Sequence, residues 1–317
     1  MEIGSFIEMQ FPKGREWYNG GNVLRLNSGR AGIYHAFRLT GCTTLWMPYY
    51  QCDSVRKFLE ARNVRLKFYH ISDQLEPDDD LIPTIGDAVL LVNYFGIMTS
   101  TKLSEISSKY NNPVIVDNSQ AFFCEPIVGA YNVYSCRKFI GVPDGAYVVG
   151  ADVKRLSNNY KRSFSSKVMG FLLERIEYGC CPSVYSQKIK NDKRIEADGV
   201  KLMSKITHTI LDGTDYEYII NKRKENYAIT QSLFGSKNKL QLNVGDVVPM
   251  VYPLLVEDDS LVDRLQKAGH FQGHWWEYLV DEMDKDNVEY YLSRYLVPIT
   301  IDQRYGRKEL EYIASKI

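Results

Sequence analysis

Four polar residues end a short apolar run in the stretch "VIVDNSQAFF", residues 114–123. Asp117 supplies a carboxylate, and Gln120, three residues later, supplies an amide. A carboxylate and an amide this close together could bind two groups of one ligand. The simpler interpretation is an Asx-type turn after a buried strand, in which Asp117 and Asn118 bond their own backbone.

A second candidate lies in "NSGRAGIYHAF", residues 27–37, where Ser-Gly directly precedes a helical pattern. The free backbone N–H groups and the dipole at such a helix start form a site for an anion such as phosphate. Ser-Gly before a helix is also a common N-cap, so this stretch alone leaves both interpretations open.

The third candidate is Lys138 in "YSCRKFIGVPDGAYVVG", residues 134–150. A strand ends in Ser-Cys-Arg-Lys, a Gly/Pro/Asp loop follows, and a second strand resumes at Ala146. Lys138 lies beside an apolar pair, whereas most lysines lie in solvent, and both placements remain open here.

The elements around these residues alternate between strands and helices. Strand patterns occupy residues 43–48, 66–71, 87–96 and 113–117, with helical patterns at 32–39, 54–63 and 102–110. This α/β order predicts a mostly parallel sheet covered by helices on both faces. Ligands bind beyond the carboxyl ends of such strands, where we expect Asp117, Asn93, Tyr94 and the region after Tyr134.

The second half of the chain predicts a smaller lobe. Residues 212–234 form one long helical pattern, opened by a turn at Asp212 and Gly213. A strand at 247–256, a helix at 260–269, a strand at 295–300 and a helix at 307–317 follow. We therefore predict a large domain over 1–235, which includes the linking helix, and a small α+β domain over 236–317. The basic, Ser-rich segment 152–204 could be an insertion that packs on a partner subunit.

Composition narrows the class of protein. The chain has 317 residues, 44% hydrophobic and 25% charged, which is ordinary for a globular protein with two lobes. The charges of its 39 basic and 39 acidic residues cancel, so the formal net charge is zero and does not indicate nucleic-acid binding. No run approaches the ~18 apolar residues of a membrane helix. The opening "MEIGSFIEMQ" lacks a basic region, so we expect no signal peptide.

Cysteine and histidine patterns give little sign of a metal. The six cysteines include no C-x-x-C pair, which predicts reduced thiols in the cytoplasm and no zinc site. The stretch "GHFQGHWWEYL" contains His270 and His274 four apart, but its two glycines disfavour the helix that a metal pair would need. Ordinary packing and contact with a substrate remain the two main alternatives for it.

Taken in order, these motifs resemble the DegT/DnrJ/EryC1/StrS family of aminotransferases. The motifs are Ser-Gly before a helix, "NYFG", "VIVDNSQAF", and a Lys followed by "PDGAYVV". "RKENY" in the long helix and "VPITIDQRYGRKELEYI" at the end of the chain are also similar. The resemblance runs from about Asn27 onward. It implies a fold-type I enzyme, a homodimer, that uses pyridoxal 5′-phosphate (PLP) to aminate keto sugars, many of them nucleotide-linked.

The resemblance also implies roles for individual residues. Lys138 would hold PLP as a Schiff base and move a proton at the substrate carbon. Asp117 would pair with the pyridine nitrogen, and Gln120 would reach the phenolate oxygen. The phosphate and ring contacts would come from Gly29, Arg30, Ala31, Ser135 and, stacked on the ring, Tyr50. Substrate contacts would come from Tyr94, His274 and Trp275.

Two departures from the family pattern stand out. The phosphate-binding Ser usually lies five residues before the Lys, whereas Ser135 lies three before Lys138. The partner-subunit motif, Gly-Tyr-Asn-x-Arg before Met-Ser or Met-Thr, is replaced by "EADGVKLMSKIT", in which only Met203 and Ser204 match. A catalytically silent relative that binds PLP or another ligand, and another PLP reaction on the same fold, are therefore the alternatives. A PLP dehydratase is disfavoured because that class normally replaces the Lys.

Overall fold

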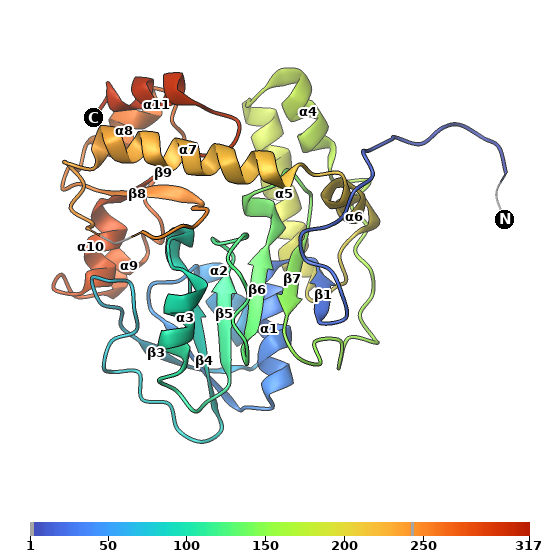
Figure 1. Ribbon diagram of the computed structural model, residues 1–317, viewed down its shortest axis with the longest axis horizontal. Coiled ribbons are helices and arrows are strands. Elements are labelled where there is room, and N and C mark those ends of the chain that lie inside the picture. Colours follow the sequence, from blue (N-terminus) through green and yellow to red (C-terminus); the bar gives the residue numbers. More distant parts are fainter. Residues whose placement is uncertain (1–2, 242–243) are drawn as a thin grey trace.

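The computed structural model describes residues 3–241 and 244–317. A seven-stranded sheet in the order β1-β7-β6-β5-β4-β2-β3 forms its centre (Figure 1). All neighbouring pairs from β6 to β3 are parallel, and β7 alone runs opposite to its neighbours. The strands are β1 Val23–Leu26, β2 Thr44–Pro48, β3 Arg65–Tyr69, β4 Asp87–Val92, β5 Val114–Asn118, β6 Tyr131–Ser135 and β7 Ala146–Val149. The predicted α/β class with a mostly parallel sheet is confirmed.

Helices cover both faces of this sheet because its central strands are apolar on both sides. Along β4, Ala88 and Leu90 pack in the same cluster as α1 (Gly29–Thr40) and α2 (Asp53–Glu60). Val89 and Leu91 point the other way, into the cluster that contains α3 (Ser100–Ser107). Successive side chains of a strand face opposite sides, so a run apolar at every position requires two cores.

The C-terminal part is built on a second, two-stranded sheet. β8 (Val251–Leu255) pairs antiparallel with β9 (Leu296–Thr300). The long helix α7 (Tyr216–Phe234) runs across the upper part of the molecule in Figure 1 and reaches both parts. The remaining C-terminal helices are α8 Leu261–Lys267, α9 Leu279–Glu282, α10 Val288–Tyr295 and α11 Arg307–Ala314. The predicted domain boundary at 235/236 stays a prediction, although α7 ends at Phe234.

Three elements differ from the sequence prediction. The long helix begins at Tyr216, because the Asp215 side chain caps it by accepting from the Tyr218 N–H. The strand expected over 87–96 ends at Val92, and a 3-10 turn, η1 (Tyr94–Gly96), follows. The segment 152–204, for which the sequence predicted helical character without bounds, contains α4 (Gly170–Tyr178) and α5 (Pro182–Asp198), and α6 (Lys205–Asp212) follows it.

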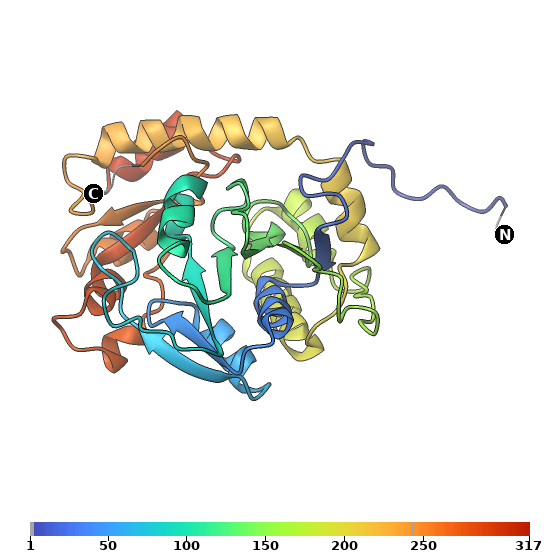
Figure 2. The same ribbon diagram turned by 60° about the horizontal axis from the view of Figure 1, so that its bottom comes forward.

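The start of the described chain projects away from the body (Figure 2). It becomes fixed at Pro12 and Gly14, which pack against the turn between α6 and α7 at Asp212 and Gly213. Among the helices that the structure describes, none is both long enough and apolar enough to cross a membrane.

Candidate active site at the carboxyl edge of the sheet

Asp117 lies at the end of β5 and is almost fully buried. Its Oδ2 accepts a hydrogen bond of 3.0 Å from the Gln51 Nε2, and its Oδ1 accepts one of 2.9 Å from the Ser119 N–H. Both donors are neutral, and no Lys, Arg or His within residues 3–241 and 244–317 forms an ion pair with this carboxylate. A buried carboxylate without a countercharge favours a ligand that brings one.

Gln120 lies on the turn that follows β5, as predicted from its spacing to Asp117. Its Oε1 accepts a hydrogen bond of 2.8 Å from the Phe95 N–H. Its Nε2 has no protein partner in the described part of the chain, so it remains a free donor. This turn and η1 pack backbone against backbone: a Cβ at Gly96, where φ is +75°, would lie 2.3 Å from the Gln120 carbonyl oxygen. Only glycine fits that approach.

The start of α1 forms an anion cradle, made of Gly29, Ser119 and Ser135. A Cβ built on Gly29 would lie 2.8 Å from the Ser119 Oγ and 3.8 Å from the Ser135 Cβ. Ser28 caps the helix, because its Oγ accepts from the Ala31 N–H at 3.3 Å. The first N–H groups of a helix have no intrahelical acceptor, so those of Gly29 and Arg30 are left to a ligand.

Two basic residues lie close to this cradle in the sequence, Arg30 directly after Gly29 and Lys138 three residues after Ser135. The Arg30 Nε is buried and has no partner among the described residues. Burial lowers the pKa of Arg30, and nearby Glu196 opposes that shift. Lys138 ends the 3-10 turn η2 (Cys136–Lys138) directly after β6, and its side chain is exposed. The neighbouring residue Arg137, in contrast, forms an ion pair with Asp192 on α5.

Aromatic side chains from segments that follow β2 and β4 and from the segment between α8 and α9 meet beside the edge. Tyr50 is fully buried, and its backbone carbonyl accepts the Tyr94 hydroxyl at 2.7 Å. The Trp276 ring stands nearly perpendicular to the Tyr50 ring, with centroids 4.3 Å apart, and Trp275 stacks on Phe95 at 5.6 Å. We call these five residues the aromatic seam. The Tyr50 hydroxyl is buried and has no partner within the described ranges.

Strained backbone accompanies the seam. Phe95 has φ +59° and Trp276 has φ +57°, values that bulky residues rarely adopt. Such strain persists only where the surrounding structure holds it, and it concentrates at functional sites.

His274, predicted to contact a substrate, directs its Nδ1 to the Leu296 carbonyl of β9 at 3.0 Å.

The sequence prediction omitted two residues of this edge, Gln51 and Ser119. Gln51 follows the carboxyl end of β2, so its position relative to the predicted sheet was an available signal. Ser119 lies inside the "DNSQ" turn that drew attention to Asp117, but its hydroxyl is directed at α1, which only the folded chain reveals.

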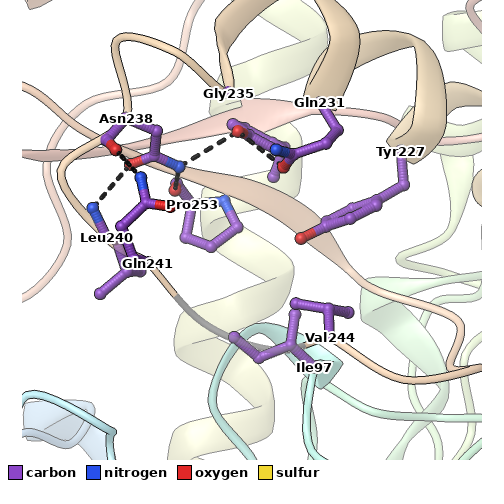
Figure 3. Close-up of a pocket in the computed structure, with 10 residues that line it drawn as sticks. Ile97, Tyr227, Gln231, Gly235, Asn238, Leu240, Gln241, Val244 and Pro253 are labelled. Carbon is purple, nitrogen blue, oxygen red and sulfur yellow. Dashed lines mark hydrogen bonds between the residues drawn. The ribbon is translucent and has the colours of Figure 1, made fainter.

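Away from this edge, the described residues form a small cavity but no metal-binding cluster. A cavity of about 30 Å³ lies between α7 and β8, lined by Tyr227, Gln231 and Asn238 among others (Figure 3). It has room for about one water and lies apart from Asp117. Within the described residues, no group of three or more His, Cys, Asp or Glu side chains could hold a metal ion.

Comparison with known proteins places the fold. No protein-family model matches the sequence, and no curated protein does. Among solved structures, the sugar aminotransferase CalS13 from Micromonospora echinospora aligns with a TM-score of 0.63 and 16% identity, over 93% of this chain and 86% of that one. The chain has the same fold.

Two further structures extend this comparison. A DegT DnrJ EryC1 StrS aminotransferase from Brucella abortus aligns with a TM-score of 0.63 and 12% identity, over 93% of this chain and 84% of that one. The E. coli GDP-4-keto-6-deoxy-D-mannose-3-dehydratase, which contains hydrated PLP, gives a TM-score of 0.58 and 14% identity, over 93% and 87%. These likenesses establish the fold-type I architecture.

The residues at the edge fit PLP. A ring with a protonated nitrogen would supply the countercharge that Asp117 lacks, and its phenolate oxygen would suit the free Gln120 Nε2. A phosphate would suit the anion cradle, which a Cβ at Gly29 would fill, and the next residue, Arg30, has a buried Nε without a partner among the described residues.

Proposed function

We propose that the protein is a PLP-dependent aminotransferase that transfers an amino group to a keto sugar, nucleotide-linked or not, or to a related keto compound. The observation that carries the proposal is the uncompensated carboxylate of Asp117 at the edge that also holds the anion cradle and Lys138. The sugar aminotransferases among the solved structures with this fold support the substrate class.

Each residue then has a chemical role. Asp117 would accept the N–H of the pyridine ring, and Gln51 and the Ser119 N–H fix the orientation of its carboxylate. Gln120 would donate to the phenolate oxygen. Gly29 and Arg30 would bind the phosphate with backbone N–H groups, with the Ser119 hydroxyl and the Ser135 side chain beside them. The Ala31 N–H is already capped by Ser28, so its part is to complete the first helical turn.

When bound, PLP supplies an electron-withdrawing ring that stabilises negative charge at the substrate carbon. Lys138 would hold the cofactor, and its amine would serve as the base and acid that moves a proton at the substrate carbon. Neither an acid nor another acceptor among the described residues bonds this amine, which leaves it free to do so. Asp117 would keep the ring nitrogen protonated.

The aromatic seam closes the edge toward the C-terminal part. Tyr50, our candidate for stacking on the ring, is packed against Tyr94 and Trp276 and is shielded from water. Tyr94, Trp275 and His274 are our candidates for contact with a substrate; Tyr94 is almost fully buried in the seam, and Trp275 is half-buried against Phe95. Exclusion of water strengthens the hydrogen bonds and charges inside the site.

A homodimer is part of the proposal. α4 and α5 expose large apolar side chains, with Ile176 at 81% and Tyr178 at 73% exposure. Apolar groups gathered on a surface mark an interface, and the segment predicted to meet a partner subunit contains both helices. We place the active site near that interface and the reaction in the cytoplasm, where the six free thiols stay reduced.

The test is covalent labelling of the purified protein. PLP should give a yellow absorbance band that borohydride abolishes, leaving the cofactor fixed on the Lys138 peptide. A panel of amino donors, glutamate and glutamine first, should then convert the bound cofactor to its amine form without an acceptor present. A label on another lysine refutes the assignment of Lys138. A dimer whose bound PLP no donor converts supports instead the catalytically silent alternative.

A further inference from the structure

Arg223, in the "RKENY" stretch of α7, is a buried cation without an acidic partner in contact. It is 2% exposed, and its hydrogen bonds go only to neutral acceptors. Its Nη1 donates to the carbonyls of Met250 at 2.8 Å and Pro249 at 3.3 Å, and its Nε donates to the Gln303 Oε1 at 3.2 Å. Burial lowers the pKa of Arg223 to about 10. Burial of a cation costs desolvation free energy, so we infer that Arg223 has a role at this position.

One set of contacts leads to the turn that holds Lys138. The Arg223 guanidinium lies 4.5 Å from the centre of the Phe139 ring, and Phe139 directly follows Lys138. Gln303, which accepts from Arg223, donates its Nε2 to the Phe139 carbonyl at 2.8 Å. Arg223, Gln303 and Phe139 thus form a closed triangle that fixes both the ring and the backbone of the residue after Lys138.

A second set leads to the turn that holds Gln120. Met250, whose carbonyl accepts from Arg223, donates its N–H to the Phe95 carbonyl at 2.7 Å. The Phe95 N–H in turn donates to the Gln120 Oε1 at 2.8 Å. This connection runs through the strained φ of +59° at Phe95, which must be held by its surroundings.

We propose that Arg223 is a positioning residue that holds the Lys138 turn and the Gln120 turn in fixed relation from behind the site. The inference rests on the proposed function, because it assigns those two turns to the cofactor. Arginine suits the position: its planar fork donates in several directions while its flat face covers an aromatic ring. Lysine keeps the charge but cannot do both at once, and methionine keeps only the bulk.

The chain offers a matched control on the same helix. Asn226, one turn along α7, is also fully buried, and its Nδ2 donates to the carbonyls of Ile301, Asp302 and Tyr305. It therefore ties α7 to the same C-terminal turn without touching Phe139 or Met250. Arg223→Met and Asn226→Leu should both lower stability in urea unfolding, but only the first removes the contacts with the two turns.

Two quantities test the proposal: the rate at which PLP attaches to Lys138 and the reactivity of the Lys138 amine. Stopped-flow absorbance should show PLP attaching to Lys138 about 10- to 100-fold more slowly in Arg223→Met, since misplacement of a reacting group by about 1 Å has that effect. Arg223→Lys should recover part of the rate, and Asn226→Leu should stay near the wild-type rate. In the cofactor-free protein, a neutral acylating reagent should label Lys138 relative to exposed Lys308 in a ratio that changes only in Arg223→Met.

Two results would overturn the inference. One is an Arg223→Met protein with the wild-type attachment rate and labelling ratio. The other is an Asn226→Leu protein that changes both as much as Arg223→Met does, since Arg223 would then act only through stability. A wild-type protein that never attaches PLP to Lys138 refutes the proposed function instead, and the labelling ratio then decides the inference on its own.

Discussion

Replacing Gly29 by alanine should sharply weaken the binding of PLP while the fold persists. The added Cβ would lie 2.8 Å from the Ser119 Oγ, so it enters the anion cradle where a phosphate would sit. Gly29 is in a helix, and alanine favours a helix by about 0.5–1 kcal/mol over glycine. The substitution therefore blocks the cradle without a backbone penalty, and any movement of Ser119 away from the methyl group disturbs the cradle further.

The size of the effect follows from the groups that the methyl displaces. The N–H groups of Gly29 and Arg30 are the two backbone donors left open at the start of α1. A hydrogen bond to a charged group contributes about 1.5–3 kcal/mol. Loss of both is about 3–6 kcal/mol, and since 1.4 kcal/mol is tenfold in affinity, the Kd for PLP should rise by about 10²- to 10⁴-fold.

The assay compares PLP with pyridoxal, which has the same ring and no phosphate. Equilibrium dialysis of both compounds against wild-type protein and Gly29→Ala should show a large loss for PLP and little change for pyridoxal. Gly32→Ala is the control, because its Cβ would meet Val133 Cγ1 at 2.7 Å in the core, one turn along α1. It should cost about 1–3 kcal/mol of stability through overpacking and leave the ratio of the two affinities unchanged.

A Gly29→Ala protein that still prefers PLP over pyridoxal as strongly as the wild type would refute the cradle. Equal losses for both compounds would also count against it, because they would indicate that the methyl group disturbs the ring site or the fold. Only the selective loss of the phosphate contribution agrees with the geometry around Gly29.

Two further predictions concern buried carboxylates. Asp117→Asn should leave PLP bound but slow amino transfer by on the order of 100-fold, about 3 kcal/mol, because the ring nitrogen loses its charged partner; an unchanged turnover with an accepted donor would contradict this. Glu16 is buried, which raises its pKa, but hydrogen bonds from His208 and Arg25 outweigh burial and hold the pKa below the ordinary 4.5. That stabilisation is present above the unfolded-state pKa and is lost as pH falls through the folded value. Urea unfolding should thus show wild-type stability falling below about pH 5, with a flatter profile for Glu16→Gln; parallel profiles would refute the role of Glu16.

The sequence predicted the large sheet well because apolarity alone specifies it. Strand β4 is buried at every position, so a continuous apolar run was a sufficient signal. β1 was missed because its four residues, "VLRL", are too few to show a period. α4 and α5 have weak patterns, since many of their apolar side chains face outward rather than into the core.

The candidate site was predictable where residue type and strand end coincide, as at Asp117 and Gln120. It was unpredictable where the contact joins distant segments. Gln51 and Asp117 are 66 residues apart, and the sequence around neither residue predicts their hydrogen bond. The positive φ of Phe95 is likewise a product of tertiary packing, because a phenylalanine gives no local reason to leave the ordinary regions.

The replaced partner-subunit motif can be assessed from the contacts of the segment that carries it. Asn27, just before the α1 cap, donates its Nδ2 to the Gly199 carbonyl at 2.9 Å, and its Oδ1 accepts from the Lys201 N–H at 3.2 Å. The Asn27 backbone carbonyl accepts from the Gly145 N–H at 2.9 Å. The segment is therefore fastened to the start of α1 on one side and to the loop after Lys138 on the other.

The two residues that keep the family pattern have a place in this anchoring. Ser204 donates both its N–H, at 3.1 Å, and its Oγ, at 2.7 Å, to the buried carboxylate of Asp144, in the same loop after Lys138. The Met203 N–H donates to the Arg25 carbonyl of β1 at 3.1 Å. These contacts lie within one chain and set the distance between the anion cradle and the Lys138 turn. The residues that differ from the family lie ahead of them. On the proposed function, their loss would leave the residues proposed to hold the cofactor in place and would change what a donor or acceptor meets from a partner subunit.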